Sequence, residues 1–196
     1  IRKVAADWRK PPNLRDYAAV CGAFSWEAVS SRLASTRGVK DVNIARLAVD
    51  RHVEGGAGAR IAFRFLSATD ECRDLSYAEL ARLTDRFAHA LANLGMVKGE
   101  RLFVLCGRIP ELYIAVLGGL KFGAVVSPLF SAFGPEPIAT RIAIGSGRVL
   151  VTTDTLYRRK VESVRAKLPT LEHVLLVGTD DEPTNLPGTD DFNTLL

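Results

Sequence analysis

The sequence predicts an α/β fold in which a doubly wound parallel sheet follows a helical extension. Between about residues 100 and 178, short and wholly apolar runs alternate with segments whose apolar residues recur at helical spacing. Strands that are apolar on both faces are typical of a parallel sheet covered by helices on both sides. A glycine or proline ends several of the helical segments. These observations predict parallel strands joined by right-handed crossovers.

Residues 1–58 predict the helical extension. Ser25 is a candidate N-cap for a first helix, and Asn43 is the expected start of a second helix, which ends at Gly55 and Gly56. The apolar residues at helical spacing in the first helix are Trp26, Val29 and Leu33. We therefore expect helices ahead of the first strand of the sheet.

Residues 59–196 are expected to form the first part of a large α/β domain. The run from Ile61 to Phe65 alternates apolar and polar residues, which predicts a strand. Ser76 and Glu79 have the spacing of a capping box, so a helix is expected to begin there. Its apolar face continues until Gly95, which is a typical stop residue.

The rest of the chain predicts strands that alternate with helices. The expected strands, each buried on both faces, are Leu102–Cys106, Ala124–Ser127, Val149–Thr152 and Val174–Val177, and the helices between them begin at Pro110, Pro135 and Asp154. The last of these helices is expected to continue to Leu168. Residues 180–196 are polar and rich in turn residues, and no closing element is expected there.

Composition argues against several classes of protein. The net charge is +4, and the cations are scattered rather than gathered into a basic stripe with aromatic residues, so no nucleic-acid partner is expected. The number of cysteines is odd, no two of them form a CxxC pair, and the three histidines are isolated. We expect no metal site and a reducing, cytoplasmic location.

The long apolar stretch from Leu112 to Phe130 is the segment to weigh against a membrane span. Lys121 lies within it, and it is interrupted by Gly118, Gly119, Gly123 and Pro128. A helix followed by a buried strand accounts better for this pattern. We therefore expect no membrane partner, and the sequence shows no signal peptide.

The strand-to-helix turns lack the common nucleotide-binding and hydrolase motifs. Neither GxGxxG after a strand nor GxxxxGK[ST] occurs, and the GxSxG turn is absent, which argues against dehydrogenases, Walker-type ATPases and α/β-hydrolases. Arg158, Arg159 and Lys160 follow the third expected buried strand and could hold phosphate groups. On spacing alone, a solvated helix face is the favoured interpretation of these three cations.

Three segments resemble motifs of the adenylate-forming enzyme family. Leu75–Leu80 (LSYAEL) is similar to the first core motif, and Leu120–Leu129 (LKFGAVVSPL) is similar to the second. Their order and separation make the resemblance specific. Phe130–Glu136 (FSAFGPE) is similar to the Phe-x-x-Phe-(Gly/Ser)-Pro-Glu element of acetyl-CoA synthetases. The leading segment around Phe24–Val29 resembles the extension that those enzymes carry ahead of the core.

The resemblance implies an AMP-forming acid–thiol ligase that converts acetate, ATP and coenzyme A into acetyl-CoA, AMP and pyrophosphate. ATP, coenzyme A and magnesium are the implied cofactors. In the family, the phosphate-binding loop, its lysine and the magnesium site come after the motifs matched here. The resemblance therefore implies an N-terminal fragment that has no catalytic residue, is inactive alone, and has the missing remainder of its own chain as a partner.

The resemblance assigns part of the coenzyme A nucleotide site to this chain. Phe130 and Ala132 come from the Phe-x-x-Phe element, and Arg158 comes from the position after the next strand. Some members of the family have Gly-Gly where this chain has Ser131 and Ala132. The chain thus departs from the pattern at a point where the backbone would approach the ligand.

Two alternatives stay open at this point. The chain could be a stand-alone flavodoxin-like binding or interaction module rather than part of an enzyme. Within the synthetase interpretation, the acid could be propionate or a longer carboxylic acid, because the residues that would contact the acyl chain are not among those matched.

Overall fold

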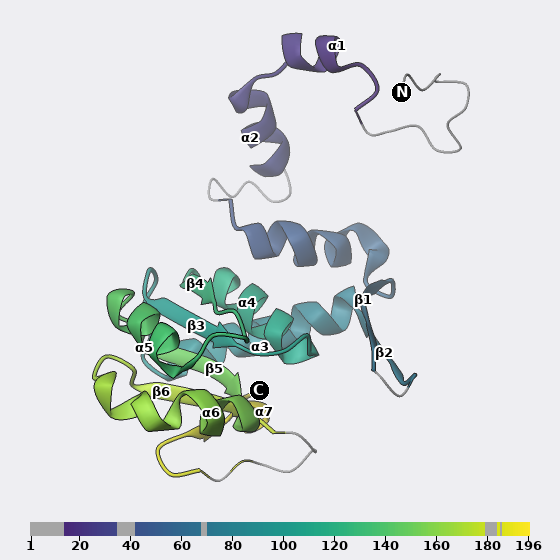
Figure 1. Cartoon of the computed structure of the whole chain (residues 1–196). Helices are drawn as coiled ribbons and strands as arrows, with labels where there is room; N and C mark the ends of the chain where they lie inside the picture. Colours follow the sequence, from purple (N-terminus) through teal and green to yellow (C-terminus); the bar gives the residue numbers. More distant parts are fainter. Residues whose placement is uncertain (1–13, 35–41, 68–69, 179–183, 185) are drawn as a thin grey trace, which may run out of the picture. The chain divides into compact units, whose positions relative to one another are not determined.

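The computed structural model describes residues 14–34, 42–67, 70–178, 184 and 186–196. The chain forms two compact units, Ile1–Val42 and Asn43–Leu196, which are described separately below (Figure 1). The domain division predicted between residues 58 and 59 stays a prediction. Some expected turn residues lie outside the described residues, namely Pro11, Pro12, Gly38, Asp180, Asp181, Pro183 and Asn185.

Two short helices make up the described part of the first unit, α1 (Tyr17–Gly22) and α2 (Trp26–Ala34). The Ser25 hydroxyl accepts a hydrogen bond from the Ala28 N–H at 3.3 Å, which confirms the predicted cap of α2. Large apolar side chains of this unit are exposed, among them Leu14, Tyr17, Val20, Phe24 and Trp26. The described helices therefore bury little apolar surface within their own unit.

A helical segment opens the second unit and begins after Asn43, as predicted. It is wound partly as a π-helix, in η2 (Arg46–Asp50) and η3 (Val53–Ala57). The Asn43 side chain accepts hydrogen bonds from two N–H groups of the first turn. It also donates to the carbonyls of Leu120 and Lys121, at 3.0 and 3.1 Å. Asn43 thus caps two helices that are distant in sequence.

A partly buried lysine attaches this helical segment to the rest of the second unit. Lys121 forms ion pairs with Asp50 at 2.7 Å and with Asp85 at 2.9 Å, and its side chain is 12% exposed. Gly56, one of the two predicted stop residues, leaves the helical conformation with φ 78°. The segment therefore packs on the helices that follow it and ends close to the predicted point.

Two antiparallel strands come next, β1 (Ile61–Leu66) and β2 (Cys72–Ser76). The first confirms the predicted strand, whereas the second was not predicted. Most of β2 is exposed, so it carries no apolar alternation that would mark it as a strand. An ion pair between Arg64 and Asp74 at 2.7 Å joins the two strands on their exposed side.

Both ends of α3 (Tyr77–Asn93) carry the motifs that the sequence predicts. At its start, the Ser76 hydroxyl accepts from the Glu79 N–H at 3.2 Å, and the Glu79 carboxylate accepts from the Ser76 N–H at 3.0 Å, which confirms the capping box. At its end, Gly95 has φ 75°, and the following N–H donates to the Leu91 carbonyl at 3.1 Å. These are the bonds of a Schellman motif.

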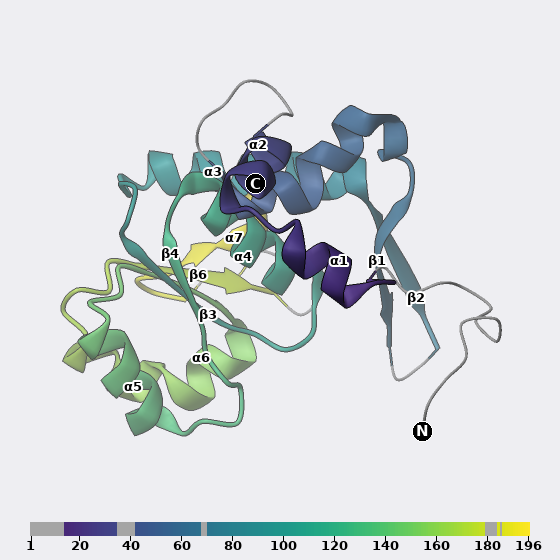
Figure 2. The ribbon, with the colours of Figure 1, turned by 90° about the horizontal axis from the view of Figure 1, so that it is seen from above.

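A five-stranded sheet forms the centre of the second unit (Figures 1 and 2). In spatial order its strands are β4 (Val125–Pro128), β3 (Arg101–Leu105), β5 (Val149–Thr153), β6 (His173–Val177) and β7 (Asp190–Asp191). All neighbouring strands are parallel. The four predicted parallel strands are confirmed.

Two expectations about the sheet were wrong. The strand predicted from Ala124 to Ser127 is not buried on both faces, because β4 lies at the edge of the sheet and Val125 is 54% exposed. The segment 180–196 does contain closing elements, since β7 extends the sheet and Phe192 is fully buried directly after it. A strand of two aspartates has no apolar pattern that could have predicted it.

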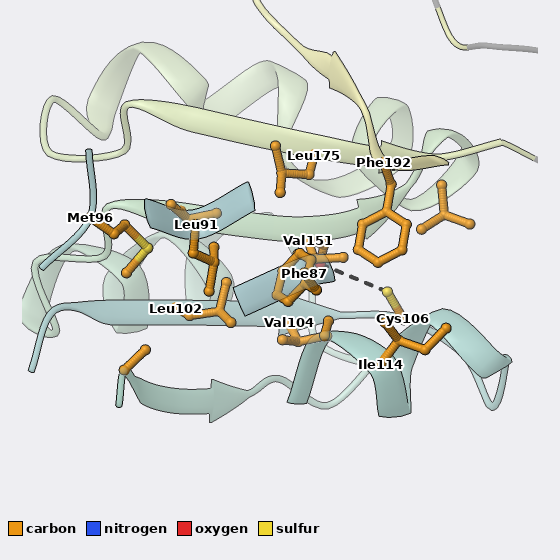
Figure 3. Close-up of a cluster of buried hydrophobic side chains, with 14 of the residues drawn as sticks. Phe87, Leu91, Met96, Leu102, Val104, Cys106, Ile114, Val151, Leu175 and Phe192 are labelled. Atoms are coloured by element: carbon orange, nitrogen blue, oxygen red, sulfur yellow. Dashed lines mark hydrogen bonds between the residues drawn. The ribbon is translucent and has the colours of Figure 1, made fainter. Parts of the chain in front are cut away.

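Helices cover both faces of the sheet, which confirms the doubly wound α/β fold (Figure 2). Along β3, Leu102 and Val104 face one core, and Phe103 and Leu105 face the other. The first core, shown in Figure 3, lies under α3, α4 (Pro110–Phe122) and α7 (Phe192–Leu195), and the second lies under α5 (Pro135–Ile144), α6 (Asp154–Lys160) and η4 (Glu162–Lys167).

Two adjacent glycines let α4 pack closely on both α3 and the sheet. A Cβ atom at Gly118 would lie 2.9 Å from the Phe87 ring, and a Cβ atom at Gly119 would lie 2.5 Å from Leu102. The helix and strand predicted for the long apolar stretch are thus α4 and β4. Gly118 and Gly119 serve helix packing, whereas Gly123 ends α4 in the left-handed conformation, with φ 95°.

The helix after β5 differs from the prediction at both ends. Its N-cap is Thr153 rather than Asp154, because the Thr153 hydroxyl accepts from the Leu156 N–H at 3.3 Å while Asp154 lies in the first helical turn. The predicted continuous helix is interrupted at Val161, where α6 gives way to the 3₁₀-helix η4. The four apolar residues predicted to face inward are buried nevertheless, namely Tyr157, Val161, Val164 and Leu168.

Charged residues form a connected network at the amino edge of the sheet, where β3, β5 and β6 begin. Arg148 pairs with Glu100 at 2.7 Å and with Glu172 at 2.9 Å, and it donates to the Gly95 carbonyl at 2.8 Å. Arg101 donates to two carbonyls in the loop ahead of β5, at 2.6 and 2.9 Å. The guanidinium groups at this edge therefore bind side chains and loops of the protein itself.

Candidate functional site

The carboxyl edge of the sheet carries the segment that links β4 to α5. The Leu129 N–H donates to the Val104 carbonyl at 2.8 Å and so continues the pairing of β4 with β3. The chain then reverses in a tight turn, in which the Phe133 N–H donates to the Phe130 carbonyl at 3.0 Å. We call residues 130–133 the 130–133 turn. Its place matches the edge where parallel α/β sheets usually bind ligands.

Two phenylalanine rings and an arginine shape the surface of this turn. Phe130 is 65% exposed, and its ring lies edge-on to the Phe133 ring, with centroids 5.6 Å apart. The Arg141 guanidinium lies over the Phe133 ring at 4.2 Å, in cation–π geometry. Ala132 is exposed as well. Phe133 is therefore fixed against α5, while Phe130 presents an open aromatic surface.

Lys160, from the last turn of α6, holds the 130–133 turn. Its ammonium group donates to the carbonyls of Ser131 and Phe133, the second at 2.9 Å. The sequence offered Lys160 as one of three adjacent cations for phosphate. The structure instead directs it at two backbone carbonyls, so α6 and the turn are joined by a charge-assisted contact.

Arg158 lies on the same helix and has a different partner. Its Nε donates to Asp154 Oδ1 at 2.6 Å and its Nη2 to Asp154 Oδ2 at 3.3 Å, one helical turn away. The hydrogen bond with Asp154 raises the pKa of Arg158. The side chain is 52% exposed. Its guanidinium is thus charged, solvated and held on the outer surface of α6, and the third cation, Arg159, is exposed.

The structure brings the predicted site residues together only in part. Phe130 and Ala132 share the 130–133 turn, and Lys160 links that turn to the helix that carries Arg158. Arg158 itself pairs with Asp154 rather than with the turn. The role of Phe130, Ala132 and Arg158 in ligand binding stays a prediction.

A shallow hollow of about 380 Å³ lies beside the turn. Its lining residues are Phe103, Ser127, Pro128, Leu129, Phe133, Arg141, Ile144 and Gly145. Most of these side chains are apolar, and Arg141 supplies a positive charge at the wall. The hollow runs along β4, the edge strand of the sheet. Its volume and its mostly apolar lining suit a small apolar or aromatic group.

At this edge the described residues include neither an accessible thiol nor a cluster of metal ligands. Cys106 follows β3, but burial raises the pKa of its thiol to about 12, and it contacts the Val151 carbonyl within the core (Figure 3). In the part of the chain that the structure describes, no group of three His, Cys, Asp or Glu side chains is placed to hold a metal ion. No described helix combines the length and apolar character that a membrane span requires.

Two contacts of this site could not be found from the sequence. Lys160 and Ser131 are separated by 29 positions, and the acceptor is a backbone carbonyl that has no residue signature. Arg141 and Phe133 come from different elements, so no helical spacing relates them. Phe130, in contrast, could be singled out from the sequence, because it belongs to the FSAFGPE motif.

The family described as "AMP-binding enzyme" matches residues 49–194 of the chain. Acetyl-coenzyme A synthetase from Streptomyces coelicolor is 38% identical over 144 residues, which are 69% of this chain and 22% of that protein. The corresponding enzyme from Bacillus subtilis is 33% identical over 182 residues, which are 91% of this chain and 31% of that protein. The chain therefore spans between about a fifth and a third of the length of these relatives.

Solved structures show the same fold. An acyl-CoA synthetase from Brucella canis superposes with a TM-score of 0.76 at 26% identity, over 91% of this chain and 31% of that one. An anthranilate CoA ligase solved with anthranoyl-AMP superposes with a TM-score of 0.65 at 20% identity, over 77% of this chain and 26% of that one. The second likeness concerns the fold alone.

Proposed function

The chain belongs to the AMP-binding enzyme family, and from that premise we propose that it is a part of an AMP-forming acetyl-CoA synthetase, an acid–thiol ligase. In this reaction ATP and acetate give acetyl-adenylate and pyrophosphate, and the thiol of coenzyme A then takes the acetyl group and releases AMP. The named relatives support acetate as the acid. Propionate or a longer acid is the alternative within the same class.

The observation that carries the proposal is the position of the FSAFGPE segment. It resembles an acetyl-CoA synthetase element, and it lies at the carboxyl edge of the sheet with Phe130 and Ala132 exposed. Ligands of doubly wound sheets bind at this edge. A stand-alone binding module is disfavoured, because the family match covers residues 49–194.

We assign the coenzyme A nucleotide to this edge. The exposed face of Phe130 offers a surface on which the adenine base can stack, and Ala132 offers its backbone. Arg158 supplies a charge for a phosphate group. Two of its five N–H donors bind Asp154, so the others are available to phosphate oxygens. Exposed ion pairs of this kind contribute little to stability, so a phosphate can share the guanidinium.

ATP and magnesium are assigned to residues outside this chain. Adenylation requires donors and a cation that neutralise the phosphates. The sequence has no Gly/Ser/Thr-rich loop followed by a lysine, and the described residues do not fit a magnesium site. We therefore propose that the 196 residues alone are inactive in adenylation. A cytoplasmic location is part of the same proposal, in line with three free cysteines.

Acetate-dependent exchange of labelled pyrophosphate into ATP tests this function. We expect no exchange by the 196-residue chain, and exchange by a polypeptide that contains the chain together with a phosphate-binding loop. Propionate and butyrate in place of acetate measure the acyl preference. Exchange by the 196-residue chain would refute the inactivity proposal, and its absence from the longer polypeptide with every acid would refute the ligase assignment.

A further inference from the structure

The contact between Lys160 and the 130–133 turn fixes the direction in which two backbone carbonyls point. The ammonium group donates to two carbonyls that are two residues apart, those of Ser131 and Phe133. Both carbonyls therefore point toward α6. Lys160 is half-buried, and its side chain spans from the end of α6 to a turn 27 to 29 positions earlier.

The peptide planes then fix where the neighbouring N–H groups point. In a trans peptide the C=O and the following N–H point in opposite directions, and no cis peptide occurs among the described residues. With the Ser131 and Phe133 carbonyls directed at Lys160, the N–H groups of Ala132 and Gly134 point away from α6. Neither of these N–H groups donates to an acceptor in the described part of the chain.

The adjacent helix start supplies one alternative donor, the N–H of Glu136. Pro135 and Pro137 have no N–H, so the first turn of α5 lacks two of its usual free donors. Glu136 adds a negative charge there, although it pairs with Lys167 at 2.8 Å. The Glu136 carboxylate disfavours an anion beside its own N–H, so a phosphate near this turn is better served by the N–H groups of Ala132 and Gly134.

We propose that Lys160 is a positioning residue of the coenzyme A site. It does not bind the phosphates itself. It fixes the 130–133 turn so that the N–H groups of Ala132 and Gly134 and the ring of Phe130 face the nucleotide. This inference rests on the proposed function, because it assumes that the nucleotide of coenzyme A is the ligand of the turn.

The test compares Lys160→Met with Arg159→Met in the 196-residue chain. Both changes remove one positive charge from neighbouring positions, but Arg159 is exposed and does not hold the turn. Amide hydrogen exchange of Phe133, followed by NMR, reports the closure of the turn without any ligand. We expect Lys160→Met to accelerate this exchange by about tenfold, since a hydrogen bond to a charged group is lost. Arg159→Met should leave it unchanged.

Adenosine 3′,5′-bisphosphate, the nucleotide end of coenzyme A, is the ligand for the second measurement. In the unsubstituted chain it should shift the amide resonances of Ala132 and Gly134. Lys160→Met should weaken its binding by about tenfold, Arg159→Met by clearly less, and Lys160→Arg should restore most of the affinity.

The outcomes separate the two ideas. Unchanged Phe133 exchange in Lys160→Met would overturn the positioning role, whatever the nucleotide does. Equal weakening by Lys160→Met and Arg159→Met would overturn it as well, because Lys160 would then act through charge alone. If the nucleotide shifts no resonance in the unsubstituted chain, the assignment of coenzyme A to this turn fails. The positioning role of Lys160 in a coenzyme A site then fails as well, even if the exchange result shows that Lys160 holds the turn.

Discussion

The two edges of the parallel sheet use their polar groups differently. At the amino edge, Arg148 and Arg101 bind carboxylates and loop carbonyls of the same unit. At the carboxyl edge, Lys160 holds the 130–133 turn, while Phe130 is exposed and Arg158 is half-exposed. The paired charges at the amino edge join elements of the fold to one another, whereas the carboxyl edge leaves an aromatic ring and part of a guanidinium open to solvent.

A pair of glycine substitutions gives the largest expected contrast. Gly147→Ala, at the amino edge, should lower the free energy of unfolding by about 1–3 kcal/mol, because the new Cβ would lie 2.5 Å from the Phe103 ring. Gly134→Ala, at the carboxyl edge, should cost less, about 0.5 kcal/mol from the poorer N-cap of α5, since no atom lies within 4 Å and its φ is −77°. Urea unfolding measures both. Equal losses would contradict the distinction between the edges.

Arg158→Ala tests the carboxyl edge from the side of binding. We expect about tenfold weaker apparent affinity for coenzyme A, because a charged hydrogen bond to phosphate is lost. The urea midpoint should barely move, since the pair with Asp154 is exposed. Steady-state kinetics of the complete enzyme provides the measurement, and its pyrophosphate exchange should be unaffected. A loss with Arg159→Ala but not with Arg158→Ala would shift the assignment by one residue.

Thr153, at the carboxyl edge, has a structural role that Thr153→Ala should reveal as a loss of stability. Loss of the N-cap of α6 should cost about 1 kcal/mol of unfolding free energy, whereas Thr153→Ser retains the hydroxyl and should cost less. Thermal unfolding of the two variants measures the difference. Equal effects of the two substitutions would show that the methyl group, rather than the cap, matters at this position.

Substitution of Glu100 at the amino edge should have a smaller effect on the free energy of unfolding, and this effect should depend on pH. The Val97 N–H and the Arg148 guanidinium lower the pKa of Glu100 below its ordinary value of 4.5. The ionised form therefore stabilises the fold above that pH, and the contribution is lost as the pH falls through the lowered pKa. Glu100→Gln should be less stable than the parent at neutral pH.

The difference between Glu100→Gln and the parent should shrink under acid conditions, below about pH 4.5. Glu136→Gln serves as the control, because its carboxylate is exposed at the other edge. Unfolding curves recorded across the acid range provide the measurement. A difference that stays constant with pH would show that the carboxylate of Glu100 is not what the amino edge requires.

Local signals were sufficient for most of the fold. The capping box at Ser76 and the prolines and glycines at helix ends depend only on nearby residues, so these boundaries could be predicted. The edge position of β4 could not, because an apolar run does not reveal how many strands lie beside it. The strand β7 has two aspartates, and its pairing with β6 depends on tertiary contacts alone.

The candidate site was predictable only through its motifs. Phe130, Ala132 and Arg158 were assigned by resemblance, and their role in binding stays a prediction. The contacts of Lys160 with carbonyls and of Arg148 with Glu100 join residues that are 27 to 48 positions apart. No spacing rule relates such residues, and a backbone acceptor can belong to any residue type.

The buried position of Cys106 has a practical consequence for following motions of the sheet. Cys21 and Cys72 are exposed, so a thiol reagent in solution should modify them at once. Cys106 is buried at the end of β3, and its thiolate form is suppressed, so it can react only when the first core opens. Its labelling rate therefore measures the frequency of that opening. In a chain with Cys21 and Cys72 replaced by serine, thiol labelling would report the opening of the carboxyl edge through the Cys106 sulfur alone.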